Sequence, residues 1–252
     1  MSTPSFPPDL IQLLRRIQRV AVLTGAGISA ESGVPTFRDA QTGLWAQYDP
    51  HELATPEAFA RNPKLVWEWY AWRRERVAGT RPNPGHLALV ELERRIPVFT
   101  LITQNVDGLH QHAGSQQVLE LHGNLFRTRC CQCGKPAETW EESDEVPPRC
   151  PACASWLRPD VIWFGEMLPA AALGEAEAAA TQCQVFVSIG TSTVVYPAAE
   201  LPFTALRGSA TVVEINPQST PLSNCAGFVL PGKAGDVLPA LVEAVWGTGA
   251  AF

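Results

Sequence analysis

A buried strand that runs directly into a glycine turn is the feature that most constrains how this chain can fold. Residues 20–24 (VAVLT) are almost wholly apolar, and Gly25-Ala26-Gly27 follows them without a linker. A strand that is apolar on both sides has to be covered on both faces, as in a parallel sheet flanked by helices. Glycines between such a strand and Ile28-Ser29-Ala30, where a helix can begin, are typical of the start of a doubly wound α/β sheet.

Further apolar runs continue the α/β alternation along the chain. We expect strands at residues 98–103, 118–121, 185–189, 211–215 and 228–230, and helices at residues 10–19, 170–180 and 236–245. Residues 36–80 interrupt the alternation with loop and helix, and Asn62-Pro63 and Gly79 are good start and stop signals for a helix there. Residues 124–157 interrupt it again and hold five of the seven cysteines. The sequence thus predicts a parallel-sheet domain with a helical insert and a metal-stapled insert.

Two cysteine pairs predict a metal site in the second insert. Cys130-x-x-Cys133 and Cys150-x-x-Cys153 are separated by sixteen residues, a spacing that suits a four-cysteine zinc ribbon. Four thiolate ligands close the coordination sphere, so the zinc would be structural. Cys131 is not expected to be a ligand, because pairing it with Cys133 leaves one residue between them. The alternative is that the four cysteines form two disulfides or remain buried thiols.

Composition and charge restrict the class of protein. Hydrophobic residues make up 46% of the chain and charged residues 17%, which is typical of a globular protein. The net charge of −6 argues against a general nucleic-acid binder. The apolar runs are shorter than the roughly 20 residues that a membrane span needs, and we identify no export signal. Seven cysteines without an export signal predict a reducing, cytoplasmic location.

Polar residues gather where several predicted strands end. Residues 103–108 (TQNVDG) follow the second strand, His122 follows the third, and residues 190–192 (GTS) follow the fourth. The carboxyl ends of parallel strands form the edge at which open α/β sheets bind ligands. No strand that ends in an acidic residue follows about twenty residues after the glycine turn to hold a ribose, so Asn216 or the 190–192 turn becomes the candidate. His122 suits general-base chemistry, although a packed structural histidine is the alternative.

The motifs, taken in order, resemble the sirtuins over about residues 9–245. They are residues 25–33 (GAGISAESG), 35–39 (PTFRD), 103–110 (TQNVDGLH), 121–123 (LHG), both cysteine pairs and residues 190–192. Sirtuins are NAD-dependent protein-lysine deacylases. The resemblance implies one sirtuin domain over residues 1–252, with a Rossmann-like large part at about 1–35, 81–123 and 158–252. It implies a small module at about 36–80 (helical) and 124–157 (zinc ribbon).

The resemblance also implies a role for individual residues. The acyl-lysine oxygen would attack C1′ of the nicotinamide ribose, and His122 would then act as general base on a ribose hydroxyl, giving nicotinamide and O-acyl-ADP-ribose. The residues implied in catalysis are His122, Asn105 and Asp107. Those implied to bind NAD are Gly25, Ala26, Gly27, Ile28, Ala30, Phe37, Arg38, Gln104, Asn105, Val106, Asp107, Gly190, Thr191, Ser192, Asn216 and Ala234. An acyl-peptide would add as a strand between residues 161–165 and 192–196, against Val161, Ile162, Phe164, Gly165 and Val194.

The helical insert is similar to that of class III sirtuins, in which a Tyr-x-x-Arg pair and a small alanine line the acyl pocket. The matching residues are Ala54, Tyr70 and Arg73. Spacing of three places Tyr70 and Arg73 on one helix face, and a guanidinium beside a phenol suits the carboxylate of a succinyl or malonyl group. The alternative is a packed tyrosine and a surface arginine in an arginine-rich helix.

Two other functions remain as alternatives. A mono-ADP-ribosyltransferase would use the same NAD site with an arginine or water as acceptor. A zinc-ribbon interaction or nucleic-acid module would use the sheet only as a scaffold. The net charge of −6 and the set of His122, Asn105 and Asp107 favour the deacylase.

Overall fold

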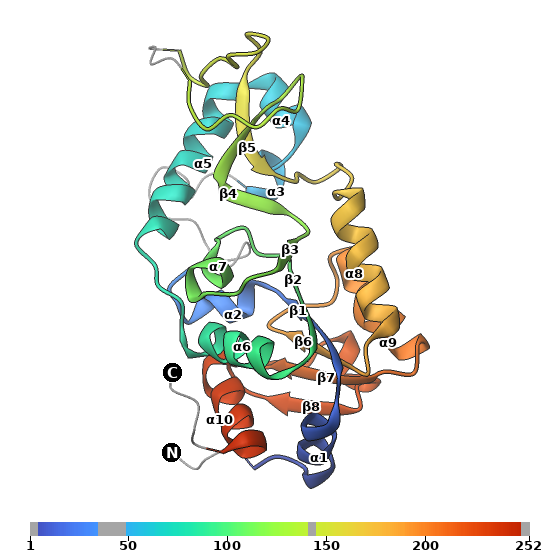
Figure 1. Ribbon diagram of the computed structural model, residues 1–252. Helices are drawn as coiled ribbons and strands as arrows, with labels where there is room; N and C mark the ends of the chain where they lie inside the picture. The colour runs from blue at the N-terminus through green and yellow to red at the C-terminus, as the bar shows by residue number, and fades with distance from the viewer. Residues whose placement is uncertain (1–4, 35–48, 141–144, 248–252) are drawn as a thin grey trace.

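A six-stranded parallel sheet forms the larger part of the molecule. The computed structural model describes residues 5–34, 49–140 and 145–247 (Figure 1). The strand order is β3-β2-β1-β6-β7-β8, and every neighbouring pair is parallel. The strands are β1 (Arg19–Thr24), β2 (Val98–Thr103), β3 (Val118–Glu120), β6 (Val185–Ile189), β7 (Thr211–Asn216) and β8 (Phe228–Pro231). The Rossmann-like α/β fold is confirmed, and each strand predicted for it lies within one residue of its observed bounds.

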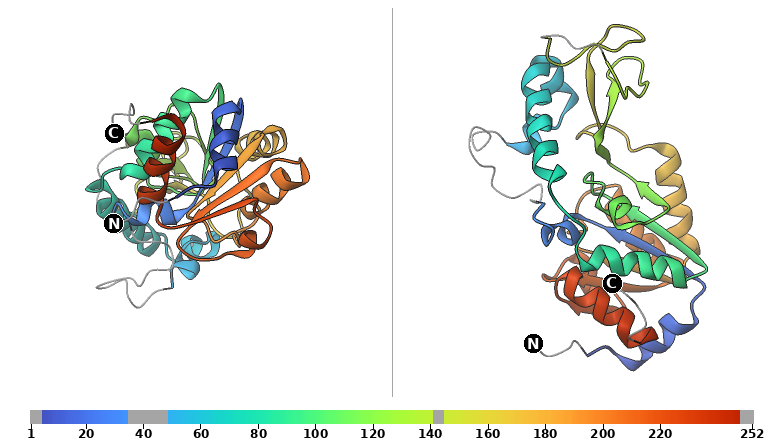
Figure 2. Two further views of the ribbon diagram at one scale, coloured as in Figure 1. Left: turned by 90° about the horizontal axis from the view of Figure 1, so that it is seen from below. Right: turned by 60° about the vertical axis from the view of Figure 1, so that its left-hand side comes forward.

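Helices cover both faces of this sheet. Val20 and Val22 of β1 pack with α1 (Pro8–Arg16), α6 (Pro84–Arg95) and α10 (Ala234–Trp246). Ala21 and Leu23 point to the opposite face and pack with α8 (Ala170–Gln182) and α9 (Leu201–Arg207). Figure 2 shows α6 and α10 on one side of the sheet and α8 on the other. The alternation along β1 explains why that strand is apolar throughout.

A second, smaller sheet stands beyond the large one. It pairs β4 (Gly123–Cys130) with β5 (Leu157–Val161) in antiparallel fashion, and the pairing is irregular between Asn124 and Thr128. Helices α3 (Pro50–Leu53), α4 (Pro56–Arg61) and α5 (Pro63–Ala78) lie beside it (Figure 1). The sequence did not reveal β4, because this irregularity and two exposed neighbours in mid-strand obscure the period-two pattern. It did not reveal β5, because that strand contains a buried arginine and a proline.

The helical insert follows its sequence signals closely. The Asn62 side chain accepts a hydrogen bond from the backbone N–H of Leu65, and α5 ends before Gly79, as predicted. Strand β5 carries the second sheet on to Val161, beyond the expected module boundary at residue 157. The division into a large part and a small module stays a prediction. None of the described helices is long and apolar enough to cross a lipid bilayer.

Candidate active site

Two turns meet in close backbone contact at the carboxyl edge of the large sheet. The turn from β1 into α2 (Ala26–Ala30) packs against the turn after β6, and the Gly27 N–H donates to the Gly190 carbonyl at 2.8 Å. A Cβ on Gly27 would lie 2.6 Å from the Gly190 Cα, and one on Gly25 would lie 2.8 Å from the Gly190 oxygen. Only residues without a side chain allow this approach. The sequence pattern thus reflects backbone packing, and its role in phosphate binding stays a prediction.

A hydrogen-bonded chain continues along the same edge. The Gln104 amide donates to the Thr191 Oγ1 at 3.0 Å, and the Asn216 amide donates to the Thr191 carbonyl at 2.8 Å. These contacts join the ends of β2, β6 and β7. Three segments predicted to bind NAD are therefore brought together, and Asn216 helps to hold the turn beside it.

Asn105 and Asp107 lie in the segment that follows β2, and both are buried. The Asn105 amide donates to the Gly25 carbonyl at 3.0 Å and lies 3.2 Å from Ser29 Oγ. Asp107 accepts from the Leu109 backbone N–H at 2.9 Å. Burial raises the pKa of Asp107, while hydrogen bonds from Leu109 and Ser29 oppose that rise. Ser29 links both side chains and was not singled out from the sequence; its position within the glycine motif was the available signal.

His122 follows β3, and its ring is oriented by one backbone contact. Its Nδ1 lies 2.9 Å from the Gln104 carbonyl oxygen. A carbonyl only accepts, so the proton of the neutral ring is on Nδ1, and Nε2 carries the lone pair. Burial lowers the pKa of His122, and the bond to Gln104 partly opposes that effect. The neutral imidazole that a general base needs is therefore favoured at neutral pH.

Two other histidines behave differently. His86 lies in the capping box that starts α6, and its ring centre is 4.9 Å from that of His110. Both are fully buried, and burial lowers the pKa of His86 to about 4 and that of His110 to about 3. Both rings are therefore neutral and structural. His86 Nδ1 accepts from the Asn83 backbone, which directs Nε2–H toward Ser29 Oγ at 3.5 Å.

The segments expected to hold a peptide differ in exposure. Phe164 and Val194 are 42% and 48% exposed, whereas Val161 is buried in β5 opposite Gly123. The Ile162 N–H donates to the His122 carbonyl, and the Phe164 N–H donates to the Ala54 carbonyl, each at 2.9 Å. The exposed apolar surface thus begins at Phe164, and the backbone of Ile162 and Phe164 is tied to the candidate base and to the helical insert.

The three residues expected to line an acyl pocket lie near one another. Ala54 and Tyr70 belong to one buried cluster that joins α3, α5 and β5, and the Arg73 Cζ lies 5.5 Å from the centre of the Tyr70 ring. Burial raises the pKa of Tyr70 and lowers that of Arg73, and their electrostatic interaction opposes both shifts. Tyr70 is packed in the core, as the alternative interpretation of this helix expected, and it also faces Arg73.

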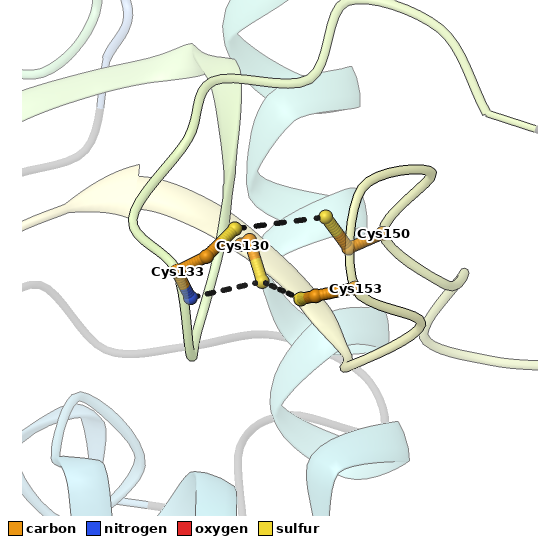
Figure 3. Close-up of side chains that lie close together, drawn as sticks. All are labelled: Cys130, Cys133, Cys150 and Cys153. Atoms are coloured by element: carbon orange, nitrogen blue, oxygen red, sulfur yellow. Dashed lines mark hydrogen bonds between the residues drawn. The ribbon is translucent and has the colours of Figure 1, made fainter.

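The four predicted ligand cysteines converge at the tip of the second sheet. Figure 3 shows Cys130 at the end of β4 and Cys133 on the loop after it, facing Cys150 and Cys153 on the loop before β5. The Sγ atoms of Cys130 and Cys153 are 3.4 Å apart, those of Cys133 and Cys150 are 3.9 Å apart, and all four lie within 4.8 Å of one another. Tetrahedral zinc with Zn–S bonds of about 2.3 Å places sulfurs about 3.8 Å apart. The donor set therefore fits zinc, the cysteines are free thiols rather than disulfides, and Cys131 is outside the cluster.

The remaining predicted contacts are located as follows. Ala234 is buried at the first turn of α10, and Val106 accepts a backbone hydrogen bond from Leu125 at 2.8 Å. Phe37 and Arg38 lie outside the described residues. The individual assignments to NAD and peptide stay predictions.

Comparison with known proteins identifies close relatives over most of the chain. The profile of the Sir2 family matches residues 25–197. An NAD-dependent protein deacylase of Aquifex aeolicus is 54% identical, covering 85% of this chain and 90% of the relative, and NAD-dependent protein deacylase 1 of Pseudomonas aeruginosa is 52% identical, covering 93% and 97%.

Solved structures of Sir2 proteins also superpose on most of this chain. A complex of a Sir2 homolog with NAD superposes with a TM-score of 0.89 at 46% identity, covering 97% of this chain and 96% of the other. A Sir2 protein bound to an acetylated peptide superposes with a TM-score of 0.83 at 32% identity, covering 93% and 96%.

Proposed function

Because the chain belongs to the Sir2 family, we propose that it is an NAD-dependent protein-lysine deacylase. Its substrates would be acyl-lysine proteins or peptides, and its products the free lysine, nicotinamide and O-acyl-ADP-ribose. The observation that carries this proposal is His122. Its Nδ1 is bound to the Gln104 carbonyl, so its Nε2 is available as a base at the edge that also holds the Gly25 turn.

Each residue at this edge has a task that its contacts support. When bound, NAD supplies an electrophilic ribose carbon to the acyl oxygen. The positive N-terminal end of α2, which begins at Ala26, would attract the pyrophosphate. Asn105 and Asp107, already held by Gly25 and Leu109, would orient the ribose and nicotinamide. His122 Nε2 would accept the proton of a ribose hydroxyl.

We also propose one structural zinc per chain, held by Cys130, Cys133, Cys150 and Cys153. The sulfur distances and the closed four-thiolate set support it. The metal would join the two loops at the ends of β4 and β5. Reduced thiols are needed for this role, which supports a cytoplasmic location for the enzyme.

The acyl group is proposed to include succinyl or malonyl. Arg73 lies against Tyr70, and a guanidinium and a phenol together match a carboxylate. Ala54 leaves space because its side chain is a single methyl group, and its carbonyl anchors Phe164. A peptide would add as a strand beside Phe164 and Val194, which are exposed.

An acyl-peptide panel tests the activity directly. Acetyl, malonyl, succinyl and long-chain versions of one peptide are incubated with and without NAD, and peptide and nucleotide products are quantified. The proposal expects one O-acyl-ADP-ribose for each lysine released and no reaction without NAD. ADP-ribose transferred to arginine or water, with the acyl-lysine intact, would instead indicate a mono-ADP-ribosyltransferase.

A further inference from the structure

Tyr70 makes a buried hydrogen bond to a tryptophan from another element. Trp163, just after β5, donates from Nε1 to the Tyr70 hydroxyl oxygen at 3.0 Å. Tyr70 is 1% exposed and Trp163 3% exposed, and their ring centres are 6.3 Å apart. The bond is therefore shielded from bulk water. A buried donor or acceptor without a partner is costly there, so it matters which group donates and which accepts.

The chemistry of the two groups determines the direction of that bond. An indole N–H can only donate, so the phenol oxygen must accept. The Arg73 guanidinium, which faces the same phenol, also has donors only. Tyr70 consequently meets donors on these two sides, and the hydrogen-bonding role left to it is to donate its own proton. A carboxylate, which only accepts, is the matching ligand.

Trp163 is itself held by contacts on several sides. The Arg158 Cζ lies 3.2 Å from the centre of its ring, and Phe59 packs at a ring-centre distance of 5.2 Å. Its backbone N–H donates to Glu166 at 2.8 Å, and Glu166 pairs with Arg158 at 2.5 Å. The orientation of the indole is therefore fixed by contacts within the protein.

We propose that Trp163 is a positioning residue for acyl selectivity, because its indole N–H makes Tyr70 a proton donor toward the distal carboxylate of the acyl group. This inference rests on the proposed succinyl or malonyl activity. It adds that selectivity depends on a residue outside the helix that carries Tyr70 and Arg73. The same segment also contacts the candidate base, because the N–H of Ile162, next to Trp163, donates to the His122 carbonyl.

Steady-state kinetics on matched succinyl and acetyl peptides test the proposal in a double-mutant cycle. The proteins are wild type, Trp163→Phe, Tyr70→Phe and the double variant. Trp163→Phe should raise KM for the succinyl peptide about three- to tenfold, the effect of one hydrogen bond, and change KM for the acetyl peptide less. In the Tyr70→Phe background, the same substitution should add little to the succinyl KM, because its partner is already absent.

Trp140→Phe is the matched control, since Trp140 packs against Trp67 near the cysteine cluster and does not contact Tyr70 in the described structure. It should leave the succinyl-to-acetyl KM ratio as in wild type. Indole N–H signals in ¹H–¹⁵N NMR spectra give a readout that does not need turnover. Tyr70→Phe should move one indole signal upfield, and Trp163→Phe should remove that same signal.

The outcomes separate the two levels of the proposal. A wild-type enzyme that does not remove succinyl or malonyl groups would overturn the acid-acyl function and this inference with it. Succinyl activity with equal KM changes on both peptides for Trp163→Phe, or effects that add in the double variant, would overturn the role of Trp163 alone. If Trp163→Phe does not fold, an indole spectrum unchanged by Tyr70→Phe would overturn it.

Discussion

His122 is available as a base because of one backbone contact. The Gln104 carbonyl holds the proton on Nδ1. We predict that His122→Ala nearly abolishes deacylation and still binds NAD, since the cofactor contacts come from other segments. Removing a general base typically lowers the rate by a factor on the order of 10² to 10⁴. Deacylation within a few-fold of wild type, with NAD binding measured by calorimetry, would assign the base elsewhere.

The lowered pKa of His122 has a consequence for the pH profile. Burial is the main cause, and it disfavours the protonated ring. A base works when deprotonated, so the acidic limb of kcat/KM against pH, which reports the free enzyme, should be centred below 6.5, the ordinary pKa of histidine. A limb centred above 6.5 would contradict the neutral, buried imidazole described here.

Arg73 is the residue whose charge distinguishes acyl groups. We predict that Arg73→Met raises KM steeply for succinyl-lysine and changes it little for acetyl-lysine, because only the first has a carboxylate to pair. A buried charge left without its partner typically costs about 2 to 5 kcal/mol. The measurement is kcat/KM on both peptides, and Tyr70→Phe should cost less. Equal losses on both peptides would mean that Arg73 supports the fold or the cofactor, and the proposed function would then be that of a deacetylase.

At the scale of elements, the β1–α2 turn and the turn after β6 depend on each other. A methyl group at residue 27 would overlap the Gly190 Cα, so Gly27→Ala should weaken NAD binding and stability, with overpacking costing about 1 to 3 kcal/mol. Gly174→Ala in α8 is the control, because a Cβ there has no neighbour within 4 Å. Thermal melting with and without NAD would compare them, and equal behaviour of the two variants would refute the packing argument.

We expect the β4–β5 pair to depend on its metal. The sheet has only two strands in the described structure and an irregular register, and structural zinc binding is coupled to folding. Cys150→Ala should therefore lose zinc and lower the melting temperature together, whereas Cys131→Ala should retain one zinc per chain. Metal analysis of the purified proteins checks both. Full zinc content in Cys150→Ala would show that another ligand set binds the ion.

At the scale of the whole molecule, a chain of ion pairs joins the two sheets. Glu120 of β3 pairs with Arg127 of β4 at 2.6 Å, Arg127 pairs with Asp160 of β5 at 3.0 Å, and the series continues through Arg129 to Glu166 at 3.6 and 3.7 Å. It ends at Arg158, which is buried. The chain connects the large sheet to the segment that carries Trp163.

The acid stability of the molecule should reflect Glu166. Burial alone would raise the pKa of its carboxyl, but Arg158 and neighbouring donors lower it below 4.5. A lowered pKa stabilises the fold above the unfolded value, and that contribution is lost as pH falls through the folded value. Glu166→Gln should cost about 1 to 3 kcal/mol at neutral pH. Urea titrations should also show a smaller decline in the unfolding free energy of this variant below pH 4.5. An unchanged decline would exclude Glu166 as a source of the acid sensitivity.

The sequence alone determined the parallel sheet, the α5 boundaries and the cysteine cluster, because each depends on local pattern or short spacing. The apolar run before Gly25, the Asn62 cap and the two Cys-x-x-Cys pairs all act within a few residues. Tertiary structure decided the partners of polar atoms. Ser29 linking Asn105 and Asp107, and Trp163 donating to Tyr70 across 93 positions, depend on how distant segments pack. Hydrogen bonds act only at short range, so residues far apart in the chain become partners only once the fold has brought them together.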